Sequence, residues 1–322
     1  MLKVSGLTVR FGGLTAVDKL SFSVLPKEIL AIIGPNGAGK TTVFNVLSGF
    51  TLPTEGQIIV GGENLREAPT VAHFTRWLFI GSVSAFILLA LFRLQSIWSE
   101  AVTSLYVYLA PFPWGQSFSN FVHRLIPQNG TDWIVFVSGF LLGAASAAIT
   151  WLKLRYSAER SSQLGLARTF QNIRLFPTLS VGENVLVALE NTQASNRDKK
   201  LFEITQLTDL SSHLHLPASS LSYGLQRRLE IARALACSPT ILLLDEPAAG
   251  LNPRESVELM ELVRKIRDRG TTVILIEHDM KLVMAVSDRI VVLDHGEKIA
   301  EGIPTDIRQN PSVIQAYLGG AL

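Results

Sequence analysis

The stretch Gly34-Pro35-Asn36-Gly37-Ala38-Gly39-Lys40-Thr41-Thr42 decides the fold expected for this chain of 322 residues. It follows an apolar run from Glu28 to Ile33 and precedes a helical pattern that extends to about Gly49. Glycines let the backbone N–H groups of such a loop surround a phosphate at a helix N-terminus. The stretch matches the phosphate-binding loop pattern, in which Lys40 contacts the β- and γ-phosphates and Thr41 is a Mg²⁺ ligand. An ordinary glycine-rich turn is the alternative.

A second motif places two carboxylates directly after an apolar run, in Ile241-Leu242-Leu243-Leu244-Asp245-Glu246-Pro247. Ligands of parallel sheets bind at the carboxyl ends of the strands. Asp245 therefore suits a metal shell, and Glu246 is placed to orient or deprotonate an attacking water. Taken alone, such a pair is more often a helix cap or a surface pair. Its meaning comes from following a phosphate-binding loop.

Short β-rich runs alternate with helical patterns elsewhere in the chain. Besides the run before the glycine loop, they are Thr240–Leu244, Thr271–Ile276 and Arg289–Leu293. This alternation predicts an α/β fold with a parallel sheet and crossover helices.

An apolar segment interrupts this pattern. No charged residue occurs between Trp77 and Phe92 or between Trp133 and Leu152, and the mean hydropathy of the whole chain is +0.30. The second run has 20 residues, about the thickness of a hydrocarbon core at 1.5 Å per residue. We therefore predict a nucleotide-binding domain over residues 1–71 and 158–322 and an inserted membrane hairpin over residues 72–157. Its spans are expected at about 77–94 and 133–152, the first recruiting Arg93 as a snorkelling residue.

Charges around the two apolar runs indicate their orientation. The cationic residues before and after the pair are Arg66, Arg76, Lys153, Arg155 and Arg160, and the charged residues between the runs are Arg93, Glu100, Arg124 and Asp132. Cationic residues favour the cytoplasmic side, so both ends of the hairpin are expected in the cytoplasm. The alternative is a helical hairpin buried in a globular core.

The connection between the runs carries two amphipathic patterns. Apolar residues recur at helical spacing at Trp98, Val102, Leu105 and Leu109, and again at Phe118, Phe121, Val122 and Leu125. Helices of this kind lie in a membrane interface or form a small packed cap.

Composition excludes several other functions. Twenty-nine Lys plus Arg against 27 Asp plus Glu give a net charge of +2, which predicts no nucleic-acid partner. Cys237 is the single cysteine, so no internal disulfide is expected. The first residues lead into no apolar run of signal-peptide length, so the bulk of the chain is expected in the cytoplasm.

The segment Ser222-Tyr223-Gly224-Leu225-Gln226 opens a helix shortly before the acidic strand, with Ser222 as its N-cap. Together with the glycine loop and the acidic strand it resembles the signature motif of ABC-type transporter ATPases. The resemblance covers nearly all of the chain outside the insertion. It implies a RecA-like parallel sheet core with an antiparallel β subdomain and a helical subdomain.

The resemblance also assigns roles to single residues. It implies that Phe11 stacks on adenine with Val17 beside it, that Gln171 touches Mg²⁺ or water and senses the membrane partner, and that His278 contacts the γ-phosphate. Without the family, Phe11 would be read as a core residue, Gln171 as a turn residue and His278 as a lone structural histidine. The implied catalytic residues are Glu246, His278 and Gln171, and the implied metal ligands are Thr41, Gln171 and Asp245.

The cofactors implied by the resemblance are ATP and Mg²⁺. It further implies that the phosphate loop of one chain, Gly34 to Thr42, and the signature residues Ser222 to Gln226 of a second ATPase subunit together enclose each ATP. The partners implied by the resemblance are integral-membrane permeases and, through them, a substrate-binding protein, with the nucleotide-binding domain at the cytoplasmic side of the inner membrane.

Within the family, Gly165–Phe176, Arg227–Leu235 and the tail from Ala300 resemble the ATPases of branched-chain and neutral amino-acid importers. Urea or amide uptake, a non-transport ATP-driven clamp and a self-contained half-transporter are the alternatives. Leu225, Asn252 and Phe11 depart from the commonest residues of the family, and the insertion has no counterpart in the ordinary importer cassette.

Overall fold

The computed structural model describes residues 1–66, 69–107, 110–124, 126–190 and 196–318. It divides into two compact units, Met1–Arg66 with Tyr156–Leu322, and Glu67–Arg155. We call them the cassette and the insertion and describe each by itself. The sequence analysis set the edges of the insertion at residues 72 and 157. Leu109 and Leu125 lie outside the described residues.

The cassette is built on a six-stranded sheet with strand order β10-β9-β3-β8-β7-β6. All neighbouring pairs are parallel except the β9–β10 hairpin. The strands are β3 (Ile29–Ile33), β6 (Leu166–Arg168), β7 (Ile241–Asp245), β8 (Thr272–Ile276), β9 (Arg289–Asp294) and β10 (Glu297–Gly302). Strands β3, β7 and β8 are buried along their whole length, as expected for apolar strands covered on both faces. The predicted parallel α/β fold is confirmed.

A second, antiparallel sheet has the order β2-β1-β4-β5. Its strands are β1 (Leu2–Phe11), β2 (Leu14–Val24), β4 (Glu55–Val60) and β5 (Glu63–Asn64). The register pairs Phe11 with Leu14 at the β1–β2 turn. Helix α1 (Lys40–Leu47) shares one apolar core with this sheet and with one face of the large sheet, to which Leu30, Leu243 and Ile274 belong.

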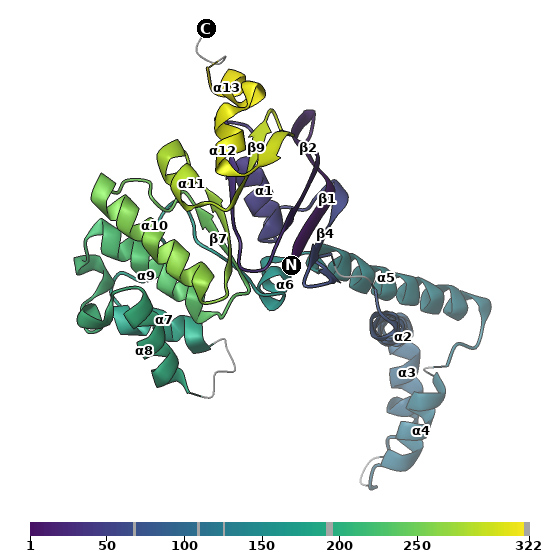
Figure 1. Cartoon of the computed structure of the whole chain (residues 1–322). Helices are drawn as coiled ribbons and strands as arrows, with labels where there is room; N and C mark the ends of the chain where they lie inside the picture. The colour runs from purple at the N-terminus through teal and green to yellow at the C-terminus, as the bar shows by residue number, and fades with distance from the viewer. Residues whose placement is uncertain (67–68, 108–109, 125, 191–195, 319–322) are drawn as a thin grey trace. The chain divides into compact units, whose positions relative to one another are not determined.

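The other face of the large sheet packs against the long helices of the cassette. Leu242, Leu244 and Val273 lie in a core with residues of α9 (Tyr223–Ala236) and α10 (Pro253–Asp268). Helices α7 (Val181–Glu190) and α8 (Arg197–Leu207) form a further core with α9, and the three are grouped beside β7 in Figure 1. The remaining cassette helices are α6 (Ala158–Gln163), α11 (Met280–Val286), α12 (Pro304–Gln309) and α13 (Pro311–Leu318), with 3-10 turns at Ser211–His213 and Ala218–Ser220.

Contacts close the cassette across the point of insertion. The Tyr156 hydroxyl donates to the carbonyl of Val46, and Ser161 Oγ donates to the carbonyl of Leu47 at 2.8 Å. Arg160 forms an ion pair of 2.8 Å with Glu63. Residues that precede and follow the insertion are therefore bound to one another within the cassette, so the insertion is a guest in a continuous domain.

The insertion consists of α2 (Val71–Phe92), α3 (Leu94–Ala101), a 3-10 turn (Thr103–Leu105), α4 (Trp114–Arg124) and α5 (Gly130–Leu154). Trp77 contacts Trp151, and Phe86 contacts Phe136, so α2 and α5 run antiparallel. Helix α2 begins six residues before the predicted span and ends at Phe92. Arg93 is the C-cap residue of α2 and forms an ion pair with Asp132, and its predicted snorkelling stays a prediction.

Candidate functional site

The phosphate loop connects β3 to α1 with a backbone that only glycine fits. Gly39 has a φ of 96°, and a Cβ there would lie 2.4 Å from the carbonyl oxygen of Ala16. At Gly34 a Cβ would lie 2.1 Å from the carbonyl oxygen of Leu293. The loop is thus wedged between β2 and the end of β9. Its backbone N–H groups are held at the start of α1, where the helix dipole favours an anion.

Lys40 lies inside this loop. Its ammonium donates to the carbonyl oxygens of Gly34 at 2.7 Å and Pro35 at 2.8 Å, and the residue is 6% exposed. Burial lowers the pKa of Lys40 from its ordinary value, and the carboxylates of Glu246 and Asp245 oppose that shift. The positive charge is therefore held at the centre of the loop by its own backbone.

The loop forms one wall of a cavity of about 450 Å³. The lining residues are Phe11, Leu14, Thr15, Ala16, Asn36, Gly37, Ala38, Gly39, Lys40, Thr41, Thr42, Glu246, His278 and His295. Phe11 is 53% exposed, which leaves its ring free to stack on a planar group. Phe11 and the loop residues from Asn36 to Thr42, half of the residues predicted to bind the cofactor, thus meet at one cavity.

Three other residues that were predicted to bind the cofactor, Val17, Gly34 and Pro35, do not line this cavity. Val17 is fully buried, and its side chain would touch a Cβ on Gly39. Gly34 and Pro35 contribute the carbonyl groups that hold Lys40. Val17 therefore supports the loop rather than presenting a surface of its own.

His295 lines the cavity, and the sequence analysis did not identify it. It lies in the turn between β9 and β10, has a φ of 46° and pairs with Asp294 at 2.8 Å. The next residue, Gly296, donates its N–H to the carbonyl of Ala38. Only the tertiary packing of this turn on the phosphate loop brings His295 to the cavity, so no local signal marks it.

Glu246, Gln171 and His278 form a hydrogen-bonded cluster at the carboxyl ends of the sheet strands. Gln171 Nε2 donates to Glu246 Oε2 at 2.9 Å, and His278 Nε2 lies 2.5 Å from Glu246 Oε1. Glu246 adopts a left-handed backbone conformation with a φ of 47°. Such a conformation costs about 1–3 kcal/mol and persists where surrounding contacts impose it. Here the backbone N–H of Glu246 donates to the carbonyl of Ile276.

Glu277 connects the segments that carry this cluster. One carboxylate oxygen accepts the N–H of Ala248 at 2.7 Å, and the other accepts the N–H of His278 at 3.2 Å. The side chain is buried, and burial raises the pKa of Glu277 from its ordinary value. Glu277 thus fixes the loop after β7 relative to the loop after β8.

Asp245 is engaged by a partner that the sequence analysis did not assign to it. Arg168 Nη2 lies 2.7 Å from Asp245 Oδ2, and both side chains are almost fully buried. Arg168 Nη1 also donates to Asn45 at 2.7 Å and to Ser48 at 3.0 Å. Asp245 is not among the residues that line the 450 Å³ cavity. Its predicted role as a metal ligand stays a prediction.

The signature residues lie apart from this cavity. Ser222 is the N-cap of α9 and accepts the N–H of Leu225 at 3.4 Å. Ser222, Gly224 and Leu225 line a separate cavity of about 290 Å³. Tyr223 is exposed at the same helix end, whereas Gln226 donates to the carbonyl of Leu221 and so faces its own helix. Within one chain, these residues do not meet the phosphate loop.

Asn252 departs from the commonest residue of the family, and its contacts explain how the position is used here. Its side chain accepts the N–H of Glu255 at 2.9 Å, and the Glu255 side chain accepts the N–H of Asn252 at 3.1 Å. This is a capping box at the start of α10, with Pro253 in the first turn. Asparagine therefore serves the helix cap as well as aspartate would.

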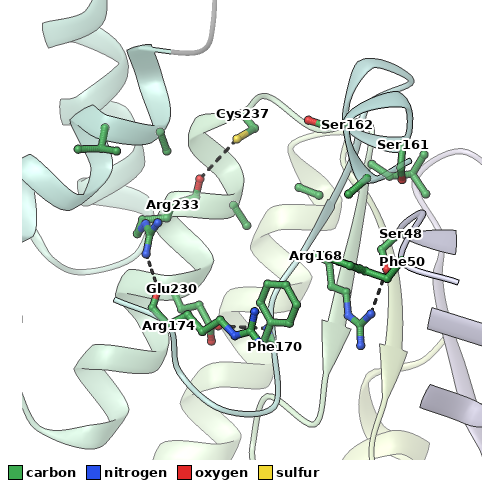
Figure 2. A pocket seen from close by; sticks show the side chains of 16 residues that line it. Ser48, Phe50, Ser161, Ser162, Arg168, Phe170, Arg174, Glu230, Arg233 and Cys237 are labelled. Atoms are coloured by element: carbon green, nitrogen blue, oxygen red, sulfur yellow. Dashed lines mark hydrogen bonds between the residues drawn. The ribbon is translucent and has the colours of Figure 1, made fainter. Parts of the chain in front are cut away.

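A third cavity, of about 440 Å³, lies between the segment around Phe170 and helix α9 (Figure 2). The guanidinium of Arg174 lies 4.1 Å from the ring centre of Phe170, and the Phe170 ring packs edge-on against Phe50. Figure 2 shows Arg233 and Cys237 along helix α9, and Glu230 next to Arg174 and Phe170. The cavity thus has aromatic and cationic walls, and one of its lining residues, Phe170, is the chain neighbour of Gln171.

Helix α9 holds the backbone of the Gln171 segment. Arg227, fully buried, donates to the carbonyls of Phe170 and Gln171 at 2.8 Å and pairs with Glu230 at 2.7 Å. Glu230 accepts the N–H of Phe170 at 3.1 Å. The signature helix is therefore hydrogen-bonded directly to the segment that carries Gln171.

These features define a phosphate-loop nucleotide-binding protein with a second, outward-facing helix tip. A family model described as ABC transporter matches residues 17–85 and 141–249, more than half of the chain. The chain belongs to the ATP-binding proteins of ABC transporters. The stretch between the two matched segments, residues 86–140, lies wholly within the insertion. A second model, described as branched-chain amino acid ATP-binding cassette transporter, matches residues 297–322.

Related sequences and solved structures support the same family assignment. The chain is 35% identical to the high-affinity branched-chain amino acid transport ATP-binding protein LivG of Escherichia coli, over 340 aligned positions that cover 100% of this chain and 98% of that protein. It is 35% identical to BraF of Pseudomonas aeruginosa, with the same coverage. The ADP conformation of MJ1267, an ATP-binding cassette of an ABC transporter, shares the fold with a TM-score of 0.64 at 21% identity, over 99% of this chain and 98% of that one.

Proposed function

We propose that this chain hydrolyses ATP and thereby energises the uptake of branched-chain amino acids through membrane permeases. The observation that carries the proposal is the Glu246 cluster, in which Gln171 and His278 hold one carboxylate in the same cavity as Lys40. The cargo class rests on LivG and BraF, whose names state branched-chain amino acid transport. The cassette is then placed at the cytoplasmic side of the inner membrane.

The cavity fits a nucleoside triphosphate with Mg²⁺. Phe11 offers an exposed ring for the base, and Lys40 a charge enclosed by phosphate-loop carbonyls. Thr41 lines this cavity, Gln171 is hydrogen-bonded to Glu246 of the same lining, and Asp245 acts electrostatically on Lys40. Their oxygen atoms are of the kind that Mg²⁺ prefers beside phosphate. Bound there, the ion would neutralise charge on the β- and γ-phosphates.

Hydrolysis requires the protein to position the attacking water and the phosphates and to accept a proton from that water. Glu246 accepts the proton of an attacking water, while its hydrogen bonds to Gln171 and His278 hold the carboxylate in place. Lys40 and the backbone N–H groups of the loop stabilise the charge of the transferred phosphoryl group. Because the loop is already folded around Lys40, little reorganisation is required at the moment of reaction.

Replacing Glu246 with glutamine tests this role. Glu246→Gln keeps the size of the side chain but removes the base, so hydrolysis should fall by roughly 10²–10⁴-fold while ATP binding is retained. Both are measured on the same purified protein, by phosphate release and by fluorescent nucleotide titration. Hydrolysis within a few-fold of the natural chain would remove Glu246 from the mechanism.

We infer that a second cassette completes the site, since Ser222, Gly224 and Leu225 line a cavity separate from the phosphate loop of their own chain. ATP bound to one loop would be covered by the signature helix of the other subunit. Ser222→Arg should therefore abolish hydrolysis and leave ATP binding to the same chain intact. Equal loss of binding would place Ser222 at its own chain's nucleotide and contradict the dimer.

We further propose that the permease contacts the third cavity, beside Gln171. Its walls include Phe50, Phe170 and Arg174, and α9 is hydrogen-bonded to the Gln171 segment. Movement of a permease segment there would be transmitted through Arg227 to the Glu246 cluster. Arg174→Glu should lower the stimulation of hydrolysis by permease, whereas the basal rate should change little.

A further inference from the structure

The two long helices of the insertion carry apolar side chains that face outward. Within their most hydrophobic 18-residue windows only 17% of α2 and 11% of α5 is buried. Exposed examples are Phe79, Ile87 and Leu91 on α2 and Ile134, Leu141 and Leu142 on α5. A core hairpin of a water-soluble domain would bury one face of each helix. Here the buried face of each helix is the one against the other helix, and apolar surface extends beyond it, which is typical of a helix pair surrounded by lipid.

The distance between aromatic residues on α5 matches a bilayer. Trp133 and Trp151 are 18 residues apart, and at 1.5 Å per residue this is about 27 Å, close to the thickness of the hydrocarbon core. Trp77 of α2 contacts Trp151, with ring centres 5.6 Å apart, and Phe136 contacts Trp133 near the other end. Each end therefore has an aromatic group of the kind that lies at a membrane interface.

Helices α2 and α5 form a close pair through small residues. A Cβ on Gly139 would lie 2.9 Å from the Cα of Ala85, and one on Gly143 would lie 2.5 Å from the Cβ of Ser84. Gly139 and Gly143 are four residues apart and so share one face of α5. Van der Waals contact of this kind holds helices together in lipid, where no hydrophobic effect draws them together.

Charges occur only at the ends of the pair, and they differ between the ends. At one end Arg93 and Asp132 form an ion pair of 2.5 Å, with side chains 10% and 2% exposed, so the two charges neutralise each other. Asp132 also accepts the backbone N–H of Gln128 at 2.9 Å. At the other end the sequence carries Arg76, Lys153 and Arg155. The positive-inside rule counts Lys and Arg, of which the connection at the neutralised end has only Arg93 and Arg124, so the rule places the end with Arg76, Lys153 and Arg155 in the cytoplasm and the neutralised end outside.

Helix α4 belongs to the connection at the neutralised end. Trp114 and Phe118 on one face are 77% and 68% exposed, and Gln116 and His123 project from the opposite face. Asn120 donates to the carbonyl of Glu100 and links α4 to α3. A packed cap would cover the two aromatic rings. An exposed apolar stripe on a short amphipathic helix instead fits the plane of a membrane interface.

We propose that residues 67–155 insert into the lipid bilayer as a helical hairpin. Helices α2 and α5 cross it, both ends emerge in the cytoplasm, and α4 lies in the outer interface with Trp114 and Phe118 toward lipid. The cassette is then tethered to the membrane by its own chain, without a permease. The partner of this surface is a phospholipid bilayer.

Tryptophan fluorescence can test whether these helices enter the bilayer, and no attached label is needed. All five tryptophans of the chain lie between Trp77 and Trp151, and the cassette has none. The full chain is reconstituted into vesicles of phosphatidylethanolamine and phosphatidylglycerol, with or without a brominated phospholipid. The bromine atoms should quench most of the tryptophan emission. Emission that is unchanged by bromination would overturn the proposal.

Single cysteines test the topology in intact cells that express the full chain without permeases. In a Cys237→Ser background, Gln116→Cys should react with a membrane-impermeant maleimide added outside, whereas the cassette control Thr305→Cys should react only after lysis. Labelling of both only after lysis would refute the crossing. Release of the natural chain from membranes by alkaline carbonate would refute it as well.

The orientation of α4 is tested by two positions on opposite faces of that helix. An environment-sensitive fluorophore attached at Phe118→Cys should be blue-shifted and quenched by the brominated lipid, and the same fluorophore at Gln116→Cys should report water. Phe118 is exposed, so its replacement does not disturb the helix pair. Equal emission from both positions would refute the interfacial placement of α4.

Discussion

Replacing Arg168 with methionine should strongly destabilise the cassette. The guanidinium neutralises Asp245 at 2.7 Å and hydrogen-bonds Asn45 and Ser48, and the side chains of the pair are only 7% and 5% exposed. Removing one partner of a buried ion pair typically costs about 3–5 kcal/mol, because the other charge is left uncompensated. At an m-value of roughly 2–3 kcal/mol/M, this corresponds to a fall of about 1–2.5 M in the urea midpoint.

The assay is urea unfolding of the full chain in detergent, followed by far-ultraviolet circular dichroism. The matched control is Arg254→Met, which breaks the exposed pair between Arg254 and Glu258, with side chains 90% and 43% exposed. Such a surface pair contributes about 1 kcal/mol or less. The double variant Arg168→Met with Asp245→Asn should recover part of the loss, since no charge is then left buried. Equal midpoints for Arg168→Met and Arg254→Met would refute the reasoning.

Three further results are expected. Because burial raises the folded-state pKa of Glu277 above its ordinary value of 4.5, its contribution to stability is present below pH 4.5 and is lost as the pH rises through the folded-state pKa. Glu277→Gln stays neutral, so urea midpoints measured across this range should decline less; an unchanged slope would argue against a titrating Glu277. The side chain introduced by Gly143→Leu would clash with Ser84, so this substitution should separate α2 from α5 at a cost of about 1–3 kcal/mol. The separation should change the near-ultraviolet circular dichroism of the tryptophans, whereas the control Leu142→Ala, at an exposed position, should leave that signal unchanged. Phe11→Ala should weaken ATP binding roughly 5- to 150-fold, the effect of losing about 1–3 kcal/mol of base stacking, and a dissociation constant equal to that of the natural chain would exclude stacking.

The sequence alone determined the class of fold and the residues of the phosphate loop. The apolar runs before Gly34 and Asp245 predicted strands whose ends the structure confirms to within one residue. These features are contiguous, and their information lies in local periodicity and in the backbone freedom of glycine. The apolar segments were visible for the same reason, although the place where α2 ends was not, because Arg93 ends that helix while paired to a residue 39 positions away.

Only the tertiary structure decided which side chains meet. Gln171 and His278 reach Glu246 across 75 and 32 residues of sequence, and Arg168 reaches Asp245 across 77. No local pattern encodes these pairs, because they depend on strand order in the sheet: β6 and β8 flank β7 and bring their carboxyl ends to the same edge. Packing of the β9–β10 turn placed His295 in the cavity in the same way. The sequence thus specified the chemical groups, and the parallel sheet brought them within hydrogen-bonding distance.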